Sequence, residues 1–83
     1  MWKIRDGKLE KSFQFENYGE AVGFINQIAD IADEYNHHPD IFLYDYKKVK
    51  VYLVTHDASN TITNLDYQVS EKIDAMHTTH FSK

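Results

Sequence analysis

Three histidines, His37, His38 and His56, are the residues of this 83-residue chain best suited to chemistry. The imidazole group titrates near neutral pH, so histidine side chains can donate and accept protons within one reaction. Pro39 follows the first two histidines and restricts the backbone just before it, which helps to hold their orientation. Asp33 lies one helical turn before His37 and can accept a proton from a ring N–H, which would fix the tautomer. We therefore expect a site of acid–base chemistry.

These histidines have two other interpretations. A His-His-Pro tripeptide by itself is often only a polar loop, and a single histidine at a strand end is often structural. Three imidazoles can also bind zinc or another transition metal. However, the adjacent His37 and His38 tend to point in different directions, and the chain has neither an HExxH spacing nor any cysteine. We therefore predict no metal site.

The elements around the histidines should bring them together. Strands are predicted over about residues 41–45 and 49–56, with a connection short enough for an antiparallel hairpin. The loop with His37 and His38 precedes the first of these strands, and His56 ends the second. Because the start of one antiparallel strand lies beside the end of its partner, this loop should approach His56.

The N-terminal part of the chain predicts a hairpin followed by a helix. Residues 1–16 alternate between apolar and polar around Asp6-Gly7, a pair that favours a tight type I′ turn. Asn17 and Glu20 form a capping box for a helix over about residues 18–36. The apolar residues at helical spacing are Val22, Ile25, Ile28, Ala29, Ala32 and Tyr35.

A second helix should complete the fold. Thr63 and Asp66 make a start like a capping box, with Asp66 expected to cap the helix, and His77 and His80 are expected in a solvated tail. The order β-β-α-β-β-α then predicts a single α+β domain over residues 1–83, with a four-stranded antiparallel sheet and both helices on one face. The apolar face of the last helix is formed by Leu65, Val69, Ile73 and Met76.

The net charge and the sheet face that the helices leave uncovered both limit the kinds of partner that the protein can have. Thirteen acids against nine Lys and Arg give a formal charge of −4, which argues against direct nucleic-acid binding and against an anionic membrane surface. There is no signal-peptide pattern, and the apolar runs are too short for a membrane helix, so we expect a soluble cytoplasmic protein. The apolar residues of the second sheet face suggest a homo-oligomer, a dimer or tetramer, and are Phe42, Tyr44, Tyr52 and Val54.

The spacing of the polar residues resembles that of a known family. The string is Asp33-x3-His37-His38-Pro39-x6-Tyr46-x9-His56-x9-Asp66. It is similar to the pattern of the pterin-4a-carbinolamine dehydratases, and the likeness extends from Trp2 through Phe13-x-Phe15 and Gly23-Phe24 to Thr55-His56. The chain departs from the family in starting without an N-terminal helix, in carrying Ile41 where Trp is common, and in the loop of residues 57–62.

The resemblance implies dehydration of a 4a-hydroxytetrahydropterin to quinonoid dihydropterin and water, in tetrahydrobiopterin recycling, without a metal or organic cofactor. It marks His37, His38 and His56 as active-site residues. We expect His56 and His37 to divide the acid and base roles, with His38 binding and orienting the ring. The expected substrate contacts are Pro39, Thr55 and Tyr46, and the expected supporting residues are Asp33 and Asp66.

Two alternatives to the enzyme remain. The same fold can act as a protein-interaction module, as family members in animals do for a transcription factor, or it can bind a pterin without converting it. Retention of all three histidines favours the enzyme.

Overall fold

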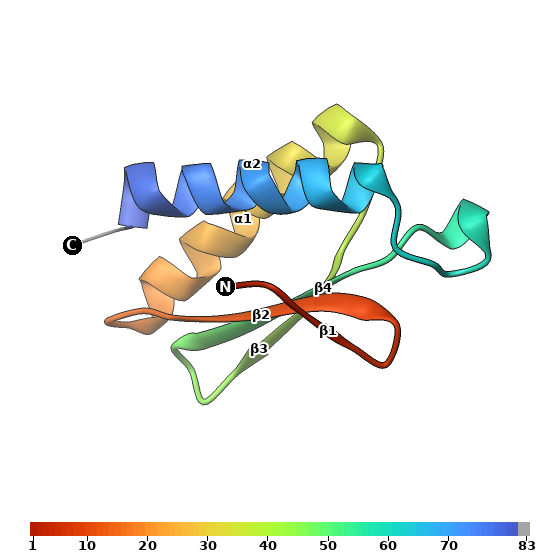
Figure 1. The fold of residues 1–83 in the computed structure, drawn as a ribbon. Coiled ribbons are helices and arrows are strands. Elements are labelled where there is room, and N and C mark those ends of the chain that lie inside the picture. The colour runs from red at the N-terminus through yellow and green to blue at the C-terminus, as the bar shows by residue number, and fades with distance from the viewer. Residues whose placement is uncertain (82–83) are drawn as a thin grey trace.

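The computed structural model describes residues 1–81 and confirms the predicted α+β class (Figure 1). The elements are β1 (Lys3–Arg5), β2 (Lys8–Gln14), α1 (Tyr18–Tyr35), β3 (Asp40–Tyr44), β4 (Lys48–Leu53), the short 3-10 helix η1 (His56–Ala58) and α2 (Asn64–Phe81). The four strands form one antiparallel sheet in the order β1-β2-β4-β3, and both helices cover the same face. Strands β1 and β3 are therefore the two edges.

The first hairpin has the predicted two-residue turn. Arg5 pairs with Lys8, and between them Asp6 and Gly7 have φ angles of 53° and 77°. Positive φ at both central residues is what a type I′ turn requires, and its twist matches that of the flanking strands. This turn fixes the register that places Leu9 and Phe13 in the core.

Helix α1 begins and ends close to where the sequence predicts. The Asn17 side chain accepts a hydrogen bond from the Glu20 N–H at 2.8 Å, which satisfies one free donor of the first turn. At the other end Asn36 is left-handed, with φ 49° and ψ 44°, and the next N–H, that of His37, donates to Ala32 at 3.0 Å. The helix therefore stops one residue before the histidine pair.

The buried face of α1 is broader than the predicted stripe and partly rotated from it. Ala29 is exposed, whereas Phe24 and Ile31, which the stripe omitted, are buried. The reason is that α1 packs against both the sheet and α2, so its buried arc includes residues facing each of them. The predicted face of α2 is confirmed for Val69, Ile73 and Met76, with Leu65 half-buried.

The prediction of a solvated tail is wrong for His77, because α2 continues to Phe81. The His77 ring packs 4.9 Å from Phe13 and 5.6 Å from Phe24, measured between centroids. Burial lowers the pKa of His77, the Lys11 charge lowers it further, and Asp74 opposes the shift. His80, three residues later, is exposed.

The second sheet face carries three of the four apolar residues assigned to it. Phe42 is exposed, and its ring stacks on Tyr44 at 5.4 Å, while Tyr52 is half-buried. Val54 is buried instead, because β4 ends at Leu53 and strand alternation no longer sets its direction. Within residues 1–81, no helix is long and apolar enough to cross a membrane.

Candidate active site

The three histidines predicted to converge line one open cleft of about 370 Å³. His37 and His38 come from the segment between α1 and β3, and His56 begins η1, just beyond β4. Antiparallel pairing of β3 with β4 sets Asp40 beside Tyr52, so the segments that flank these strands meet at one end of the sheet. The cleft is lined by Asn36, His37, His38, Pro39, Asp40, Thr55, His56, Asp57 and Leu65.

A buried carboxylate holds His37. Asp66 is fully buried at the start of α2, and its Oδ1 lies 2.6 Å from His37 Nε2, while its Oδ2 accepts from the Thr63 N–H at 2.8 Å. The Thr55 hydroxyl also donates to Oδ2 at 2.7 Å, so the 2.7 Å contact between Thr55 and Thr63 must use the Thr63 proton. With Asp66 as acceptor, His37 donates through Nε2, and Nδ1 is the ring nitrogen left for the cleft.

Asp66 therefore has two functions where the sequence predicted mainly one. It caps α2, as expected, by accepting from the Thr63 N–H in the manner of a capping box. It also fixes the ring of His37, a residue at the far end of α1 and 29 positions away in the chain. Sequence separation concealed this contact, and the only signal for it was the place of Asp66 in the family string.

The other two histidines are held more loosely. His56 Nδ1 lies 2.7 Å from Asn60 Oδ1, and since an amide oxygen only accepts, Nδ1 donates and Nε2 is left for the cleft. His38 Nε2 lies 3.4 Å from Asp33 Oδ1, with 63% of the His38 side chain exposed. The sequence led us to expect a contact between Asp33 and His37, but Asp33 contacts His38 instead. The Nε2 atom of His37 is already hydrogen-bonded to Asp66.

Two of the predicted substrate contacts belong to the cleft, and the third does not reach it in the same chain. Pro39 and Thr55 line the cleft. Tyr46 lies in the turn between β3 and β4, at the opposite end of both strands (Figure 1). At about 3.3 Å per strand residue, it is on the order of 20 Å from Asp40 at the cleft.

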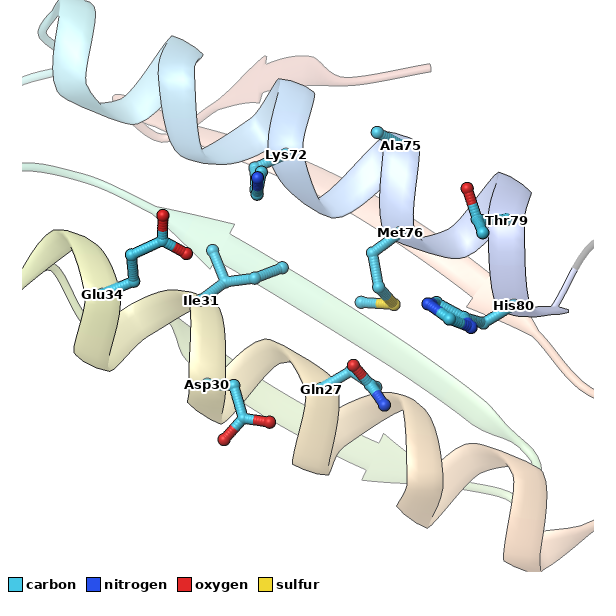
Figure 2. Close-up of a pocket in the computed structure, with 9 residues that line it drawn as sticks. All are labelled: Gln27, Asp30, Ile31, Glu34, Lys72, Ala75, Met76, Thr79 and His80. Carbon is cyan, nitrogen blue, oxygen red and sulfur yellow. The ribbon is translucent and has the colours of Figure 1, made fainter.

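A second cleft of about 370 Å³ lies between the helices (Figure 2). Its floor contains Ile31 and Met76, and charged or polar side chains such as Asp30, Glu34 and Lys72 stand around it. No histidine pair or hydrogen-bonded carboxylate–histidine contact lies there, since its histidine is the single exposed His80. The chemistry therefore concentrates in the histidine cleft.

The histidine cleft is suited to moving protons. It presents His37 Nδ1 and His56 Nε2, each on a ring whose other nitrogen is hydrogen-bonded, and one partner is a buried carboxylate. Such contacts select the tautomer and the ring direction, which is what a general base or acid needs. Across residues 1–81, no three His, Asp or Glu side chains form a group that could hold a metal ion.

Comparison with known proteins identifies the family of the chain. The family model described as pterin 4 alpha carbinolamine dehydratase matches residues 1–76. The chain belongs to this family. A relative from Sulfurisphaera tokodaii, provisionally named a pterin-4-alpha-carbinolamine dehydratase, is 47% identical over 77 residues, which are 93% of this chain and 81% of the relative. A relative from Metallosphaera sedula with the same provisional name is 36% identical over 90% of this chain and 76% of its own.

Two solved structures share the fold. A Brucella melitensis protein described as a transcriptional coactivator/pterin dehydratase superposes with a TM-score of 0.80, at 36% identity over 89% of this chain and 79% of its own. A pterin dehydratase-like protein described as a RuBisCO assembly factor of the alpha-carboxysome gives a TM-score of 0.70 over 90% of this chain and 84% of its own. Its identity is 20%, so that likeness concerns the fold alone.

Proposed function

We propose that this protein dehydrates 4a-hydroxytetrahydropterins to quinonoid dihydropterins in the cleft formed by His37, His38 and His56. The observation that carries the proposal is the convergence of these three side chains from two separate segments, with His37 held by the buried Asp66 at 2.6 Å. Membership of the pterin-4a-carbinolamine dehydratase family supplies the substrate class.

The reaction needs two proton transfers. Loss of the 4a-hydroxyl group as water requires a proton on the leaving oxygen, and formation of the quinonoid ring requires N5 to lose its proton. One group must therefore donate and another accept, and the pair returns to its starting state by passing a proton to and from solvent. Two imidazoles can do this, because imidazole is a group that gains and loses a proton near neutral pH.

The hydrogen bonds support a division of these roles between His37 and His56. His37 donates through Nε2 to Asp66, so its Nδ1 lone pair can accept the N5 proton, and the carboxylate stabilises the imidazolium that forms. His56 keeps Nδ1 on Asn60, and when protonated it can donate through Nε2 to the leaving oxygen. His38, largely exposed at the mouth, binds and orients the pterin ring.

Thr55 and Pro39 complete the proposed binding site. Both line the cleft, and the Thr55 hydroxyl is tied to Asp66, which keeps the wall beside His37 in place. Asp33 supports His38 from the exposed end of α1. The proposed chemistry uses these side chains alone, without a metal or organic cofactor.

The test is turnover of enzymatically generated 4a-hydroxytetrahydropterin, followed by ultraviolet absorbance. We expect the unmodified protein to accelerate dehydration above the buffer rate, and we expect His37→Ala and His56→Ala each to lose about 100-fold or more in kcat, the usual contribution of a general acid or base. His80→Ala, which removes an exposed histidine outside the cleft, should keep full turnover.

Three outcomes would redirect the proposal. Turnover unchanged in both His37→Ala and His56→Ala would exclude the acid–base pair. A folded protein that binds 7,8-dihydrobiopterin but does not accelerate dehydration would favour a non-catalytic pterin-binding module. A protein that neither binds nor converts pterins would favour a protein-interaction module, the role that the words "transcriptional coactivator" give to the Brucella relative.

A further inference from the structure

We infer that Asn60 is a positioning residue for the reaction. It fixes the tautomer and direction of the His56 ring, and its neutral amide gives His56 the acid role beside the base role of His37. This inference rests on the proposed function for the reaction that the two histidines divide. Asn60 lies in the loop of residues 57–62, where the chain departs from the family pattern, so the family resemblance assigns it no role.

The loop that contains Asn60 is closed by its own hydrogen bonds. The Thr55 N–H donates to the Thr61 carbonyl at 2.9 Å, and these two residues form an isolated antiparallel bridge. Inside the loop, the Ala58 N–H donates to the Thr55 carbonyl at 3.2 Å, and the Thr61 hydroxyl donates to the Ala58 carbonyl at 2.7 Å. His56 follows one end of the bridge and Asn60 precedes the other. Closure of the loop therefore brings their side chains together.

The backbone geometry at this place suits asparagine. Ser59 and Asn60 are both left-handed, each with a φ angle of 59°. Few residue types adopt this geometry readily, and Asn is one of them because its short polar side chain can form local hydrogen bonds. Here the side-chain oxygen of Asn60 reaches back to His56 Nδ1 at 2.7 Å. One residue therefore supplies both the bend of the loop and the acceptor for the ring.

The direction of the His56 ring depends on this contact. The side chains of His56 and Asn60 are exposed at the rim of the cleft, whereas Asp66, which holds His37, is fully buried. Within residues 1–81, Asn60 is the only hydrogen-bond partner of the His56 ring. The base of the loop is fixed as well, because the Thr55 hydroxyl donates to Asp66 Oδ2 at 2.7 Å. Both histidines are thus held by connected parts of one hydrogen-bonded framework.

The two histidine rings have partners of different charge. His37 lies against the Asp66 carboxylate, which stabilises the imidazolium that forms when the ring accepts a proton. His56 lies against an amide oxygen, which accepts from Nδ1–H but carries no net charge. An imidazole beside a carboxylate is the better proton acceptor, and an imidazolium beside a neutral amide is the better donor. The partners therefore assign the base role to His37 and the acid role to His56.

The tautomer of the neutral His56 ring tests the hydrogen bond without any turnover. Nitrogen NMR should find the proton on Nδ1 in the unmodified protein, whereas imidazole side chains free in water carry it mostly on Nε2. Asn60→Gly keeps a residue that accepts positive φ but removes the acceptor, so the Nε2–H form should become the major one. Ser59→Gly makes the same backbone change at the same φ angle and should keep the Nδ1–H form.

Turnover of 4a-hydroxytetrahydropterin then tests the consequence for the reaction. Asn60→Gly should lower kcat about 10-fold, as for loss of a hydrogen bond that orients a functional histidine, with little change in KM. Ser59→Gly should keep normal turnover. Both positions are exposed and lie outside the helices and strands, so both variants should fold.

The pH profile separates the charge of the partner from its shape. Asn60→Asp puts a carboxylate beside Nδ1, which would hold the ring proton to higher pH. Since an acid is active only while protonated, activity should persist to higher pH, and the maximal kcat should fall because the proton is given up less readily. The other titratable groups that line the cleft stay the same, namely His37, His38, Asp40 and Asp57. Ser59→Asp adds the same charge one residue away and should move the profile less.

These experiments separate failure of the inference from failure of the proposed function. An Nε2–H tautomer in the unmodified protein, or an Nδ1–H tautomer that survives in Asn60→Gly, would overturn the inference whatever the turnover. Turnover and pH profiles of the Asn60 variants that match those of the Ser59 variants would also overturn it, while the enzyme stands. If the unmodified protein has no turnover, the proposed function fails and the acid role of His56 fails with it, even where Asn60 holds the ring.

Discussion

At the scale of single residues, Asp66 has the largest predicted effect outside the histidines. Asp66→Asn replaces one oxygen with a donor, which must then face either the His37 Nε2–H or the donors of Thr63 and Thr55. We expect kcat/KM to fall on the order of 10- to 100-fold, as for loss of a hydrogen bond that orients a functional histidine. We expect the free energy of unfolding to fall by about 1–3 kcal/mol, because a buried polar group is left unpaired.

Asp74→Asn is the matched control for this change. Asp74 also lies in α2 and also accepts from two side chains, Trp2 Nε1 at 3.0 Å and Lys11 Nζ at 2.8 Å. It is partly exposed and faces the β1–β2 side of the molecule, away from the cleft. Turnover should stay normal in Asp74→Asn. Equal losses of kcat/KM in both variants, measured beside their unfolding curves, would show that Asp66 acts only through stability.

His77 gives a prediction about pH. Burial lowers its pKa below the usual 6.5, so between the two values the unfolded chain binds more protons than the folded one. The stability due to neutral His77 is therefore present above about pH 6.5 and is lost as the pH falls towards the folded pKa. We expect His77→Phe, which keeps a ring against Phe13 and Phe24, to flatten this dependence in urea unfolding between pH 7 and 5.

The matched comparison is His80→Phe, one turn further along α2, where the side chain is exposed. That variant should keep the pH dependence of the unmodified protein, because it leaves the contacts of the His77 ring with Phe13 and Phe24 in place. If His77→Phe and the unmodified protein lose stability in parallel below pH 6.5, other groups are responsible for the acid sensitivity. An NMR titration of the His77 ring would then show a pKa at its ordinary value.

At the scale of elements, the end of α1 determines the direction in which the histidine pair leaves the helix. Asn36 adopts left-handed geometry, which costs most residues about 1–2 kcal/mol and which Asn and Gly tolerate. We expect Asn36→Ala to lower the free energy of unfolding by about 1 kcal/mol and Asn36→Gly to leave it equal or higher. Urea unfolding of the two variants checks this, and equal losses in both would mean that the Asn36 side chain itself is needed.

Local signals account for the parts of the fold that the sequence predicted well. The Asp6-Gly7 turn, the Asn17 cap and the stop before Pro39 act over a few residues, so each can be recognised without the rest of the chain. The antiparallel pairing of β3 with β4 then brings the His37 segment to His56, and the convergence of the histidines was predicted for that reason.

Contacts between distant segments account for what the sequence did not predict. His77 contacts rings from β2 and α1, and because these contacts come from distant segments, the C-terminal residues alone led to the wrong prediction of a solvated tail. The contact of Asp66 with His37 depends on the start of α2 lying beside the end of α1, which spacing within either helix does not show. The assignment of Tyr46 to the cleft came from a family string, and one chain does not bring the two together.

At the scale of the whole molecule, charge is divided between the two layers. The strands carry six Lys and Arg against two acids, whereas the helices carry seven acids against one Lys. If two copies associated through the edges of their sheets, sheet would lie beside sheet and helix layer beside helix layer. The acidic helices of the two copies would then not face each other. Packing of helices on helices would instead oppose acidic faces, with Asp30 and Glu34 on α1 and Glu71 on α2 among the exposed residues.

The homo-oligomer expected from the sequence would make stability depend on protein concentration. A chain of this size buries only about 60% of its unfolded surface, so its own core is small, and any partner that binds only the folded form stabilises it by mass action. We expect the thermal midpoint of the unmodified protein to rise as its concentration increases from 1 to 100 µM. Phe42→Glu puts a charge into the exposed apolar pair of Phe42 and Tyr44, which should separate copies that associate through this face and remove the dependence.

Phe42 is exposed in the single chain, so its replacement should leave the fold of one copy intact, and far-ultraviolet circular dichroism verifies this. Tyr18→Glu, an equally exposed aromatic at the start of α1, is the control that should keep the concentration dependence. A midpoint that rises with concentration in both variants would place the interface away from β3. A midpoint independent of concentration in the unmodified protein would show that one copy is stable without a partner.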